Sequence, residues 1–368
     1  MGIVNYRLYN SMNKENYTQE YGVDYIVMKP DMINLSTILL SIVAILILSI
    51  TLLNAKNINE PEGRKGVITT IYKRNAIDNY HASNAISLSD VHNKTIRGLL
   101  ITGGNVPPIT LKNCSNIRIT GNKLLNSKAV GIYLYRCKNI IIDHNYITKV
   151  STGVYVQQTN GGGIAIENNQ FLNMLGPLPR GQFVQFNNVN GPGCIIANNA
   201  CENIIGESYA EDAISLYSSN GTAASPITVK NNRIRGGGPS KTGGGIALGD
   251  AGGSHQLVEN NLLVNPGQYG IGVAGGTDMQ ILNNKIYAKR ATFTNVGISV
   301  WNQYTSISAC AMIVVHGNEV NWTNAKGELN PAWNSGNCDP VIGWNDNNWN
   351  AKIDFTILPR VLISDAIR

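Results

Sequence analysis

The stretch Ile117-Arg-Ile-Thr-Gly-Asn122-Lys-Leu124 returns one repeat later as Ile140-Ile-Ile-Asp-His-Asn145-Tyr-Ile147. In both stretches, apolar residues stand five and three positions before the asparagine and again two positions after it. Side chains on a β-strand alternate between its two faces, so this spacing marks the inward side of two successive strands. The asparagine stands at the turn between the strands.

This module occurs eight times. Its anchor asparagines are Asn122, Asn145, Asn169, Asn199, Asn232, Asn261, Asn284 and Asn318. The residues five and three positions before each anchor are apolar with the single exception of Gln256. The residue two positions after each anchor is always apolar. Successive anchors are 23 to 34 residues apart, so the module is constant and the inserted residues vary. Such a pattern indicates a solenoid in which each repeat forms one coil.

Two further columns describe the corners of the coil. The residue directly before each anchor is Gly, Asn or His, and these residue types tolerate the left-handed backbone that a sharp corner requires. The residue eight positions before each anchor is Cys, Gly or Ala, which predicts a close-packed corner. We expect the anchor side chains to stack from coil to coil in a hydrogen-bonded amide ladder.

A further strand follows each anchor turn at a variable distance, as in Gly131-Ile-Tyr-Leu-Tyr135 and Gly153-Val-Tyr-Val-Gln157. Three short strands per repeat, stacked coil on coil, predict an all-β fold: a single-stranded, right-handed parallel β-helix of about nine coils. On these modules the chain resembles the pectin-lyase-like right-handed β-helix superfamily. The resemblance covers the eight anchored modules and one degenerate coil before them, at residues 96–110.

The resemblance implies the fold but no single chemistry, because that superfamily holds lyases, hydrolases, epimerases, adhesins and phage tailspikes. The Asn-Thr-Asp, Asp-Asp and Gly-His-Gly motifs of its polygalacturonase-like members are absent from this sequence. No catalytic residue is therefore assigned from the family.

The sequence divides into five expected segments. These are a poorly structured leader (1–35), a hydrophobic helix (36–54), a linker with an N-terminal cap (55–92), the β-helix (93–321) and a Trp-rich C-terminal cap (322–368).

The hydrophobic segment carries no charge and is long enough to cross a hydrocarbon core of about 30 Å. We interpret it as a transmembrane helix in the lipid bilayer, or else as the apolar core of a signal peptide. The basic residues that follow it favour a cytoplasmic C-terminal side. Gly- and Asn-rich solenoids are nevertheless typical of the cell envelope, so we expect a cell-envelope or extracellular protein that is anchored or processed at this segment.

Composition limits the partners. Charged residues make up 14% of the chain, and the net charge of +6 is spread along it without a basic run that contains aromatic residues. Nucleic acid is therefore not an expected partner. No cysteine or histidine spacing is typical of a zinc site, and we expect neither a metal nor a cofactor. Cys310 and Cys338 are the best candidates for a disulfide, which would tie the cap to the last coil.

Asp212 and Asp250 are the most conspicuous acids, and they fall on adjacent coils. Alignment of Ile214 with Ile246 places Asp250 opposite Ser218. The two acids are then six residues apart along the strand, or roughly 20 Å. Glycosidase carboxylates are about 5–9.5 Å apart, so this alignment argues against a catalytic pair.

In each repeat, a third strand follows the anchor turn at a variable distance, and the outward face of these strands is the candidate binding surface. Its aromatic, amide and acidic residues are Tyr133, Tyr135, Tyr155, Gln157, Gln185, Asp212, Tyr217, Asp250, Trp301 and Asn302. Aromatic rings stack on sugars and amides bond hydroxyl groups, which favours a polysaccharide ligand. The alternative is the ordinary preference of Tyr for exposed strands.

Four of the five tryptophans fall at the C-terminal end of the chain: Trp322, Trp333, Trp344 and Trp349. We interpret them as bulky cover for the last coil, with a sugar platform as the alternative.

Three functions remain open. The first is an exported or membrane-anchored β-helix that binds polysaccharide without cleaving it. The second is a polysaccharide lyase, epimerase or hydrolase with a site near Asp212 or Asp250, and the third is a structural spacer or adhesin shaft.

Overall fold

The computed structural model describes residues 80–177 and 181–363. The expected leader, the hydrophobic segment at 36–54 and most of the expected N-terminal linker lie outside the described residues. Within the described ranges, no helix has the length and apolar character needed to span a bilayer.

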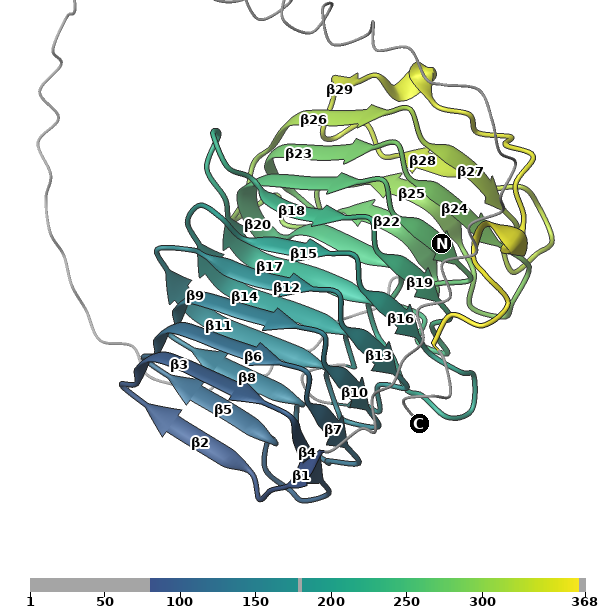
Figure 1. Cartoon of the computed structure of the whole chain (residues 1–368). Helices are drawn as coiled ribbons and strands as arrows, with labels where there is room; N and C mark the ends of the chain where they lie inside the picture. The colour runs from purple at the N-terminus through teal and green to yellow at the C-terminus, as the bar shows by residue number, and fades with distance from the viewer. Residues whose placement is uncertain (1–79, 178–180, 364–368) are drawn as a thin grey trace, which may run out of the picture. The chain divides into compact units, whose positions relative to one another are not determined.

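The described chain winds into a right-handed parallel β-helix of about nine turns (Figure 1), which confirms the predicted fold class. Each turn contributes one strand to each of three rows, and neighbours in a row pair in parallel. The row that follows the anchors consists of β1 (His81–Ala82), β4 (Leu99–Thr102), β7 (Lys123–Leu125), β10 (Tyr146–Thr148), β13 (Gln170–Leu172), β16 (Ala200–Glu202), β19 (Arg233–Arg235), β21 (Leu262–Val264), β24 (Lys285–Ala288) and β27 (Glu319–Trp322).

The row that carries the predicted binding residues consists of β2 (Ile86–Ser89), β5 (Ile109–Lys112), β8 (Ile132–Tyr135), β11 (Val154–Asn160), β14 (Val184–Asn190), β17 (Ile214–Asn220), the first half of β20 (Ile246–Glu259), β22 (Tyr269–Val273), β25 (Val296–Val300) and β28 (Ala332–Asn334). The row that precedes the anchors consists of β3 (His92–Arg97), β6 (Ser115–Thr120), β9 (Lys138–Asp143), β12 (Ile164–Glu167), β15 (Ile195–Ala197), β18 (Ile227–Lys230), the second half of β20, β23 (Gly276–Leu282), β26 (Cys310–His316) and β29 (Val341–Ile342).

Residues at matching offsets from the anchors lie directly over one another. Ile119 pairs with Ile142, and Ile142 pairs with Ile166 on the next coil. All three side chains are fully buried in the apolar core that fills the solenoid. The predicted inward columns are therefore the core columns.

The anchor asparagines form the expected ladder. The Asn145 backbone N–H and side-chain Nδ2 both donate to Asn169 Oδ1, each at 3.0 Å, and Nδ2 also donates to the Ile119 carbonyl at 2.9 Å. The pattern repeats at every anchor and continues to Asn347, whose Oδ1 accepts from Asn318. Because each buried amide satisfies backbone groups of its neighbours, the ladder stabilises the turn in every coil.

The residue before every anchor has a positive φ, between 54° at Asn231 and 69° at Gly317, as the left-handed corner requires. A second left-handed column, six residues before the anchors, was not recognised in the sequence. It includes Asn93, Asn116 and Asn139, with φ of 51–56°.

The strand rows extend on both sides of the expected β-helix bounds of 93–321. β2 pairs with β5 at the N-terminal end, and β28 and β29 pair with β25 and β26 beyond Trp322. A disulfide joins Cys310 to Cys338 with a Cα–Cα distance of 4.8 Å. The disulfide therefore ties the last coil, which contains β28 and β29, to the coil before it.

The segment after β29 runs back along the outside of the row that follows the anchors. Leu358, Leu362 and Ile363 pack against outward residues of that row, including Val264. The short helices η1 (Trp344–Asp346) and η2 (Phe355–Ile357) belong to this C-terminal cover.

Candidate functional site

The candidate binding surface, which we call the binding face, is the outward surface of eight successive strands: β8, β11, β14, β17, β20, β22, β25 and β28 (Figure 1). On each strand the inward residues are core residues, so the residues between them point outward. One outward column begins Tyr133, Tyr155, Gln185, and the next begins Tyr135, Gln157. The structure therefore brings most of the predicted site residues onto one surface.

At the N-terminal end of the binding face, Tyr133 and Tyr155 stack with ring centroids 5.7 Å apart and an interplanar angle of 19°. The Tyr133 hydroxyl donates to Gln157 Oε1 at 2.7 Å, and Asn187 Nδ2 donates to the Tyr155 hydroxyl at 2.8 Å. Tyr135 lies beside Tyr133 at 6.5 Å. These diagonal hydrogen bonds hold the two rings side by side as a preformed aromatic platform.

Two predicted contact residues are almost fully covered by protein atoms. Gln185 is 7% exposed and donates to the Phe186 carbonyl and to Ser215 Oγ. Asn302 is 6% exposed and donates to the Ser308 carbonyl. Both amides support the face rather than contact a ligand, because their donors are occupied by protein acceptors.

In the middle of the binding face, the column that continues Tyr133, Tyr155 and Gln185 carries only small side chains. The members of this column in the middle strands are Ser215, Ala247, Gly272 and Ser299. The Tyr269 ring fills part of this space. It packs so closely on Gly244 and Gly272 that an added Cβ at those glycines would lie 2.6 Å and 3.2 Å from ring carbons.

Asp212 is the hydrogen-bond partner of Tyr269. The Tyr269 hydroxyl donates to Asp212 Oδ1 at 2.6 Å, and the Gly244 N–H donates to the same oxygen at 3.0 Å. Asp212 is only 9% exposed. Burial raises the pKa of Asp212 to about 7; the two hydrogen bonds oppose this shift, and the charges of Asp250 and Glu211 reinforce it. This carboxyl can therefore carry a proton near neutral pH.

Asp250 lies nearer to Asp212 along the sheet than the sequence alignment suggested. Ile214 does pair with Ile246 as expected, but a bulge in β20 pairs Asp250 with Tyr217 instead of Ser218. Gly249, with φ of 61°, provides this bulge. The bulge shortens the separation along the strand by one residue, or about 3 Å, relative to the value inferred from an unbroken strand. The Asp250 charge acts on the Asp212 carboxyl.

Tyr304, which the sequence did not single out, donates a short hydrogen bond to Asp250 Oδ1. Burial is the main cause that raises the pKa of the Tyr304 phenol, and its contact with Asp250 adds to the shift. Each of the two acids thus has a phenol from a later coil as partner. No sequence signal identified Tyr304, because the loop after β25 has no counterpart in the other repeats.

The C-terminal end of the binding face carries Trp301 and Trp333. Trp333 pairs with Ser299 and so continues the column of Tyr133 and Tyr155. The two indole rings have centroids 5.9 Å apart. The sequence analysis placed Trp333 in the cap. The signal that could have placed it on the face is Asn347, which follows the last anchor by an ordinary repeat length.

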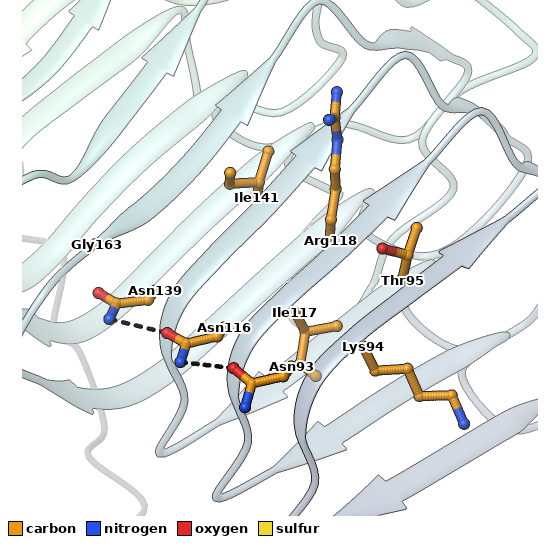
Figure 2. Close-up of a pocket in the computed structure, with 9 residues that line it drawn as sticks. All are labelled: Asn93, Lys94, Thr95, Asn116, Ile117, Arg118, Asn139, Ile141 and Gly163. Carbon is orange, nitrogen blue, oxygen red and sulfur yellow. Dashed lines mark hydrogen bonds between the residues drawn. The ribbon is translucent and has the colours of Figure 1, made fainter.

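A separate shallow pocket of about 430 Å³ lies on the outward side of β3, β6 and β9 (Figure 2). Asn116 Nδ2 donates to Asn93 Oδ1, and Asn139 Nδ2 donates to Asn116 Oδ1, so the amides that line it bond one another. Arg118 at its edge is paired with Asp143. No aromatic ring lines this pocket, in contrast to the binding face.

A second pocket of about 480 Å³ lies over β7, β10 and β13, and its lining mixes apolar residues such as Leu125 and Leu172 with charged ones such as Lys149 and Glu207. It opens on a different row from the candidate site, and none of the predicted site residues lines it.

The described ranges contain no cluster of metal ligands, and their free cysteines are buried. Among residues 80–177 and 181–363, no cluster of three or more His, Cys, Asp or Glu side chains could hold a metal ion. Cys114, Cys137, Cys194 and Cys201 are buried free thiols. Burial raises the pKa of Cys137 to about 11, so its nucleophilic thiolate form is scarce.

Comparisons with known proteins match the β-helix part of the chain. A family model described as the right handed beta helix region matches residues 62–171. Comparison with curated protein sequences finds no match. Among solved structures, the chain is similar to the catalytic domain of a GH87 alpha-1,3-glucanase in complex with tetrasaccharides, with 12% sequence identity and a TM-score of 0.34. That alignment covers 74% of this chain and 63% of the other.

The chain is therefore a right-handed parallel β-helix protein, as the resemblance noted in the sequence implied. Its outward face combines two aromatic ends with a central pair of acids that have phenol partners. Neither similarity identifies a ligand for it.

Proposed function

We propose that this protein binds polysaccharide on the binding face. The observation that carries the proposal is the stacked pair Tyr133 and Tyr155. The Tyr133 hydroxyl donates to Gln157 and the Tyr155 hydroxyl accepts from Asn187, so both rings are held in place. Aromatic rings present an apolar surface to the C–H face of a sugar, and amides beside them reach its hydroxyls. The rings are partly exposed and already in place, so binding costs little ordering entropy.

A glycan array with the purified chain tests this proposal, and Tyr155→Ala is the informative variant. We expect the wild-type protein to retain a set of polysaccharides and the variant to bind them at least tenfold more weakly, through loss of one stacking surface of roughly 1.4 kcal/mol. Phe355→Ala is the matched control, because Phe355 is an exposed aromatic residue (62%) outside the binding face. Absence of any retained glycan would leave the structural spacer as the better account.

Hydrolysis at the same face is the second candidate function. It is favoured by Asp212, a carboxyl that can hold a proton near neutral pH and whose pKa responds to the charge of a second acid, Asp250. A general acid with a raised pKa and a nearby carboxylate are the two groups that glycoside hydrolysis requires. Asp212 would protonate the leaving oxygen, and Asp250 would act on the sugar or on water.

Incubation of the bound polysaccharides with the protein, followed by an assay for reducing ends and for unsaturated products, separates binding from cleavage. A hydrolase releases reducing ends. The Asp212→Asn variant of such a hydrolase should release none and should still bind the polysaccharide. A lyase releases unsaturated products. A binding protein releases neither.

We also propose that the protein is exported to the cell envelope or beyond, and that residues 36–54 anchor it in the lipid bilayer or direct its processing. The disulfide between Cys310 and Cys338 supports export, because disulfides persist in oxidising compartments. Protease treatment of intact cells tests the location. Digestion of the solenoid without lysis is the expected result, and protection until lysis would place it in the cytoplasm.

A further inference from the structure

The inward column five positions before the anchors is apolar except at Gln256. This residue lies in the second half of β20, where it pairs with Ile227 on the preceding coil and with Met279 on the next. The Gln256 side chain is 1% exposed, so its amide group is buried in the core. A buried amide is unfavourable unless protein groups satisfy it by hydrogen bonds. The partners of this amide therefore indicate why the apolar column is broken here.

The Gln256 amide bonds backbone groups on either side of the bulge. The Gly249 N–H donates to Gln256 Oε1 at 3.0 Å, and Gln256 Nε2 donates to the Ser219 carbonyl at 2.7 Å. Gly249 directly precedes Asp250, and Ser219 pairs with Gly253 three residues after it. The register of β20 against β17 is irregular on both sides of Asp250. The extra residue of a bulge disrupts the ladder, and Gln256 ties the bulged segment to the preceding coil from inside the core.

The core leaves a defined space for this side chain. An added Cβ at Gly253 would lie 3.0 Å from Gln256 Nε2, so a side chain there would displace the amide. On the next coil, Met279 Cε comes within 2.2 Å of an added Cβ at Gly276. Glutamine and methionine are similar in length and fill equivalent spaces on the two coils. Only glutamine can hold the bulge, because methionine has no amide donor and only a weak acceptor.

The bulge determines which way Asp250 points. In an unbroken strand, Asp250 would stand four residues after Ile246 and would share its inward side. The bulge instead pairs Asp250 with Tyr217, an exposed residue of the binding face. There the Asp250 carboxyl accepts a short hydrogen bond from Tyr304.

We propose that Gln256 is a positioning residue of the binding face: its buried amide holds the bulge at Gly249 and thereby turns the Asp250 carboxyl outward, toward the ligand. This inference rests on the proposed function, because the position of Asp250 matters to a ligand only where polysaccharide contacts this surface. It adds a residue that acts on the site from inside the core and does not touch the ligand.

A double-substitution cycle tests the link between Gln256 and Asp250 without any ligand. Tyr304→Phe removes the hydroxyl that donates to Asp250, and it should lower the urea midpoint of the wild-type protein. In a Gln256→Met background, the same substitution should shift the midpoint by less than half as much, because the carboxyl is no longer held beside Tyr304. Equal shifts in the two backgrounds overturn the inference.

Val258→Ala is the matched control background. Val258 is a fully buried residue of the same strand, and its side chain cannot form a hydrogen bond. In this background Tyr304→Phe should keep its full effect on the midpoint. Hydrogen exchange of the wild-type protein gives a second measurement that needs no variant. The Gly249 amide should exchange as slowly as the core amides of β20, and fast exchange at Gly249 overturns the inference.

Isothermal titration with a polysaccharide that the wild-type protein retains connects this role to the ligand. Asp250→Ala should bind about tenfold more weakly, as expected for loss of a hydrogen bond to a charged group. Gln256→Met should also bind more weakly, and the double variant should bind no more weakly than Asp250→Ala alone. Val258→Ala should leave the affinity unchanged, and circular dichroism establishes that each variant is folded.

Two failures are distinguishable. Additive losses in the double variant, or unchanged affinity in Gln256→Met, overturn this inference and leave the proposed function standing. Failure of the wild-type protein to bind any polysaccharide overturns the proposed function itself, and with it the role of Gln256 toward a ligand.

Discussion

Asp212→Asn offers a quantitative test of how the centre of the binding face is built. The Asp212 carboxyl is almost fully buried and accepts hydrogen bonds from Tyr269 and Gly244. An asparagine at this position keeps an oxygen for those two donors but never ionises. The substitution therefore removes the titration and preserves the shape of the site.

The magnitude follows from the shift in pKa. Burial raises the pKa of Asp212 from its ordinary value of 3.8 to about 7, and each unit corresponds to about 1.4 kcal/mol. In the folded protein the carboxyl still holds its proton at pH values where the unfolded chain has lost it. The wild-type protein therefore loses stability as pH rises from about 4 to about 7, by on the order of 4 kcal/mol in all. The variant lacks this loss.

Equilibrium urea unfolding, followed by circular dichroism at several pH values between 4.5 and 8, measures the effect. The stability of Asp212→Asn relative to wild type should increase across this range by about 3 kcal/mol, because the first part of the total loss falls below pH 4.5. Glu328→Gln, which changes an exposed acid, is the control and should show no such trend. If the difference between Asp212→Asn and wild type were the same at pH 4.5 and pH 8, the buried carboxyl described here would be refuted.

Three other substitutions probe the solenoid itself, each by urea unfolding. Asn169→Ala removes a ladder amide that satisfies buried backbone groups on the preceding coil and on its own coil, and it should cost about 3 kcal/mol or more; a loss below about 1 kcal/mol would contradict the ladder's role. Replacement of Cys310 and Cys338 by alanine opens a link across 28 residues and should cost about 3–4 kcal/mol, with no effect if the thiols were unpaired. Gly153→Ala places a methyl group 2.5 Å from the Phe183 carbonyl oxygen and should destabilise by about 1–3 kcal/mol, whereas a neutral result would mean that the coils are not packed this closely.

Much of the fold could be predicted from the sequence because the repeat states its own geometry. Apolar residues at fixed offsets from an asparagine define the inward side of the strands, and the residue before it defines the corner. These rules depend only on neighbours in the chain. They held for the core columns, for the left-handed corners and for the amide ladder.

The candidate site could be predicted only in part, because it depends on departures from the repeat. The bulge at Gly249 shifts Asp250 by one position, and an alignment that assumes an unbroken strand misses it. Tyr269 and Tyr304 reach the acids from later coils through side-chain orientation and a loop of unique sequence. Trp333 was missed because the last coil departs from the consensus of the module.

The outward surface from β8 to β28 is the proposed polysaccharide site. Oxidative footprinting by mass spectrometry, with and without a polysaccharide that the protein retains, tests this claim most directly. Bound polymer should protect Tyr133, Tyr155, Trp301 and Trp333 from oxidation and leave Phe355 unchanged. Protection of Phe355 with continued oxidation of those four residues would place the ligand elsewhere and contradict the account.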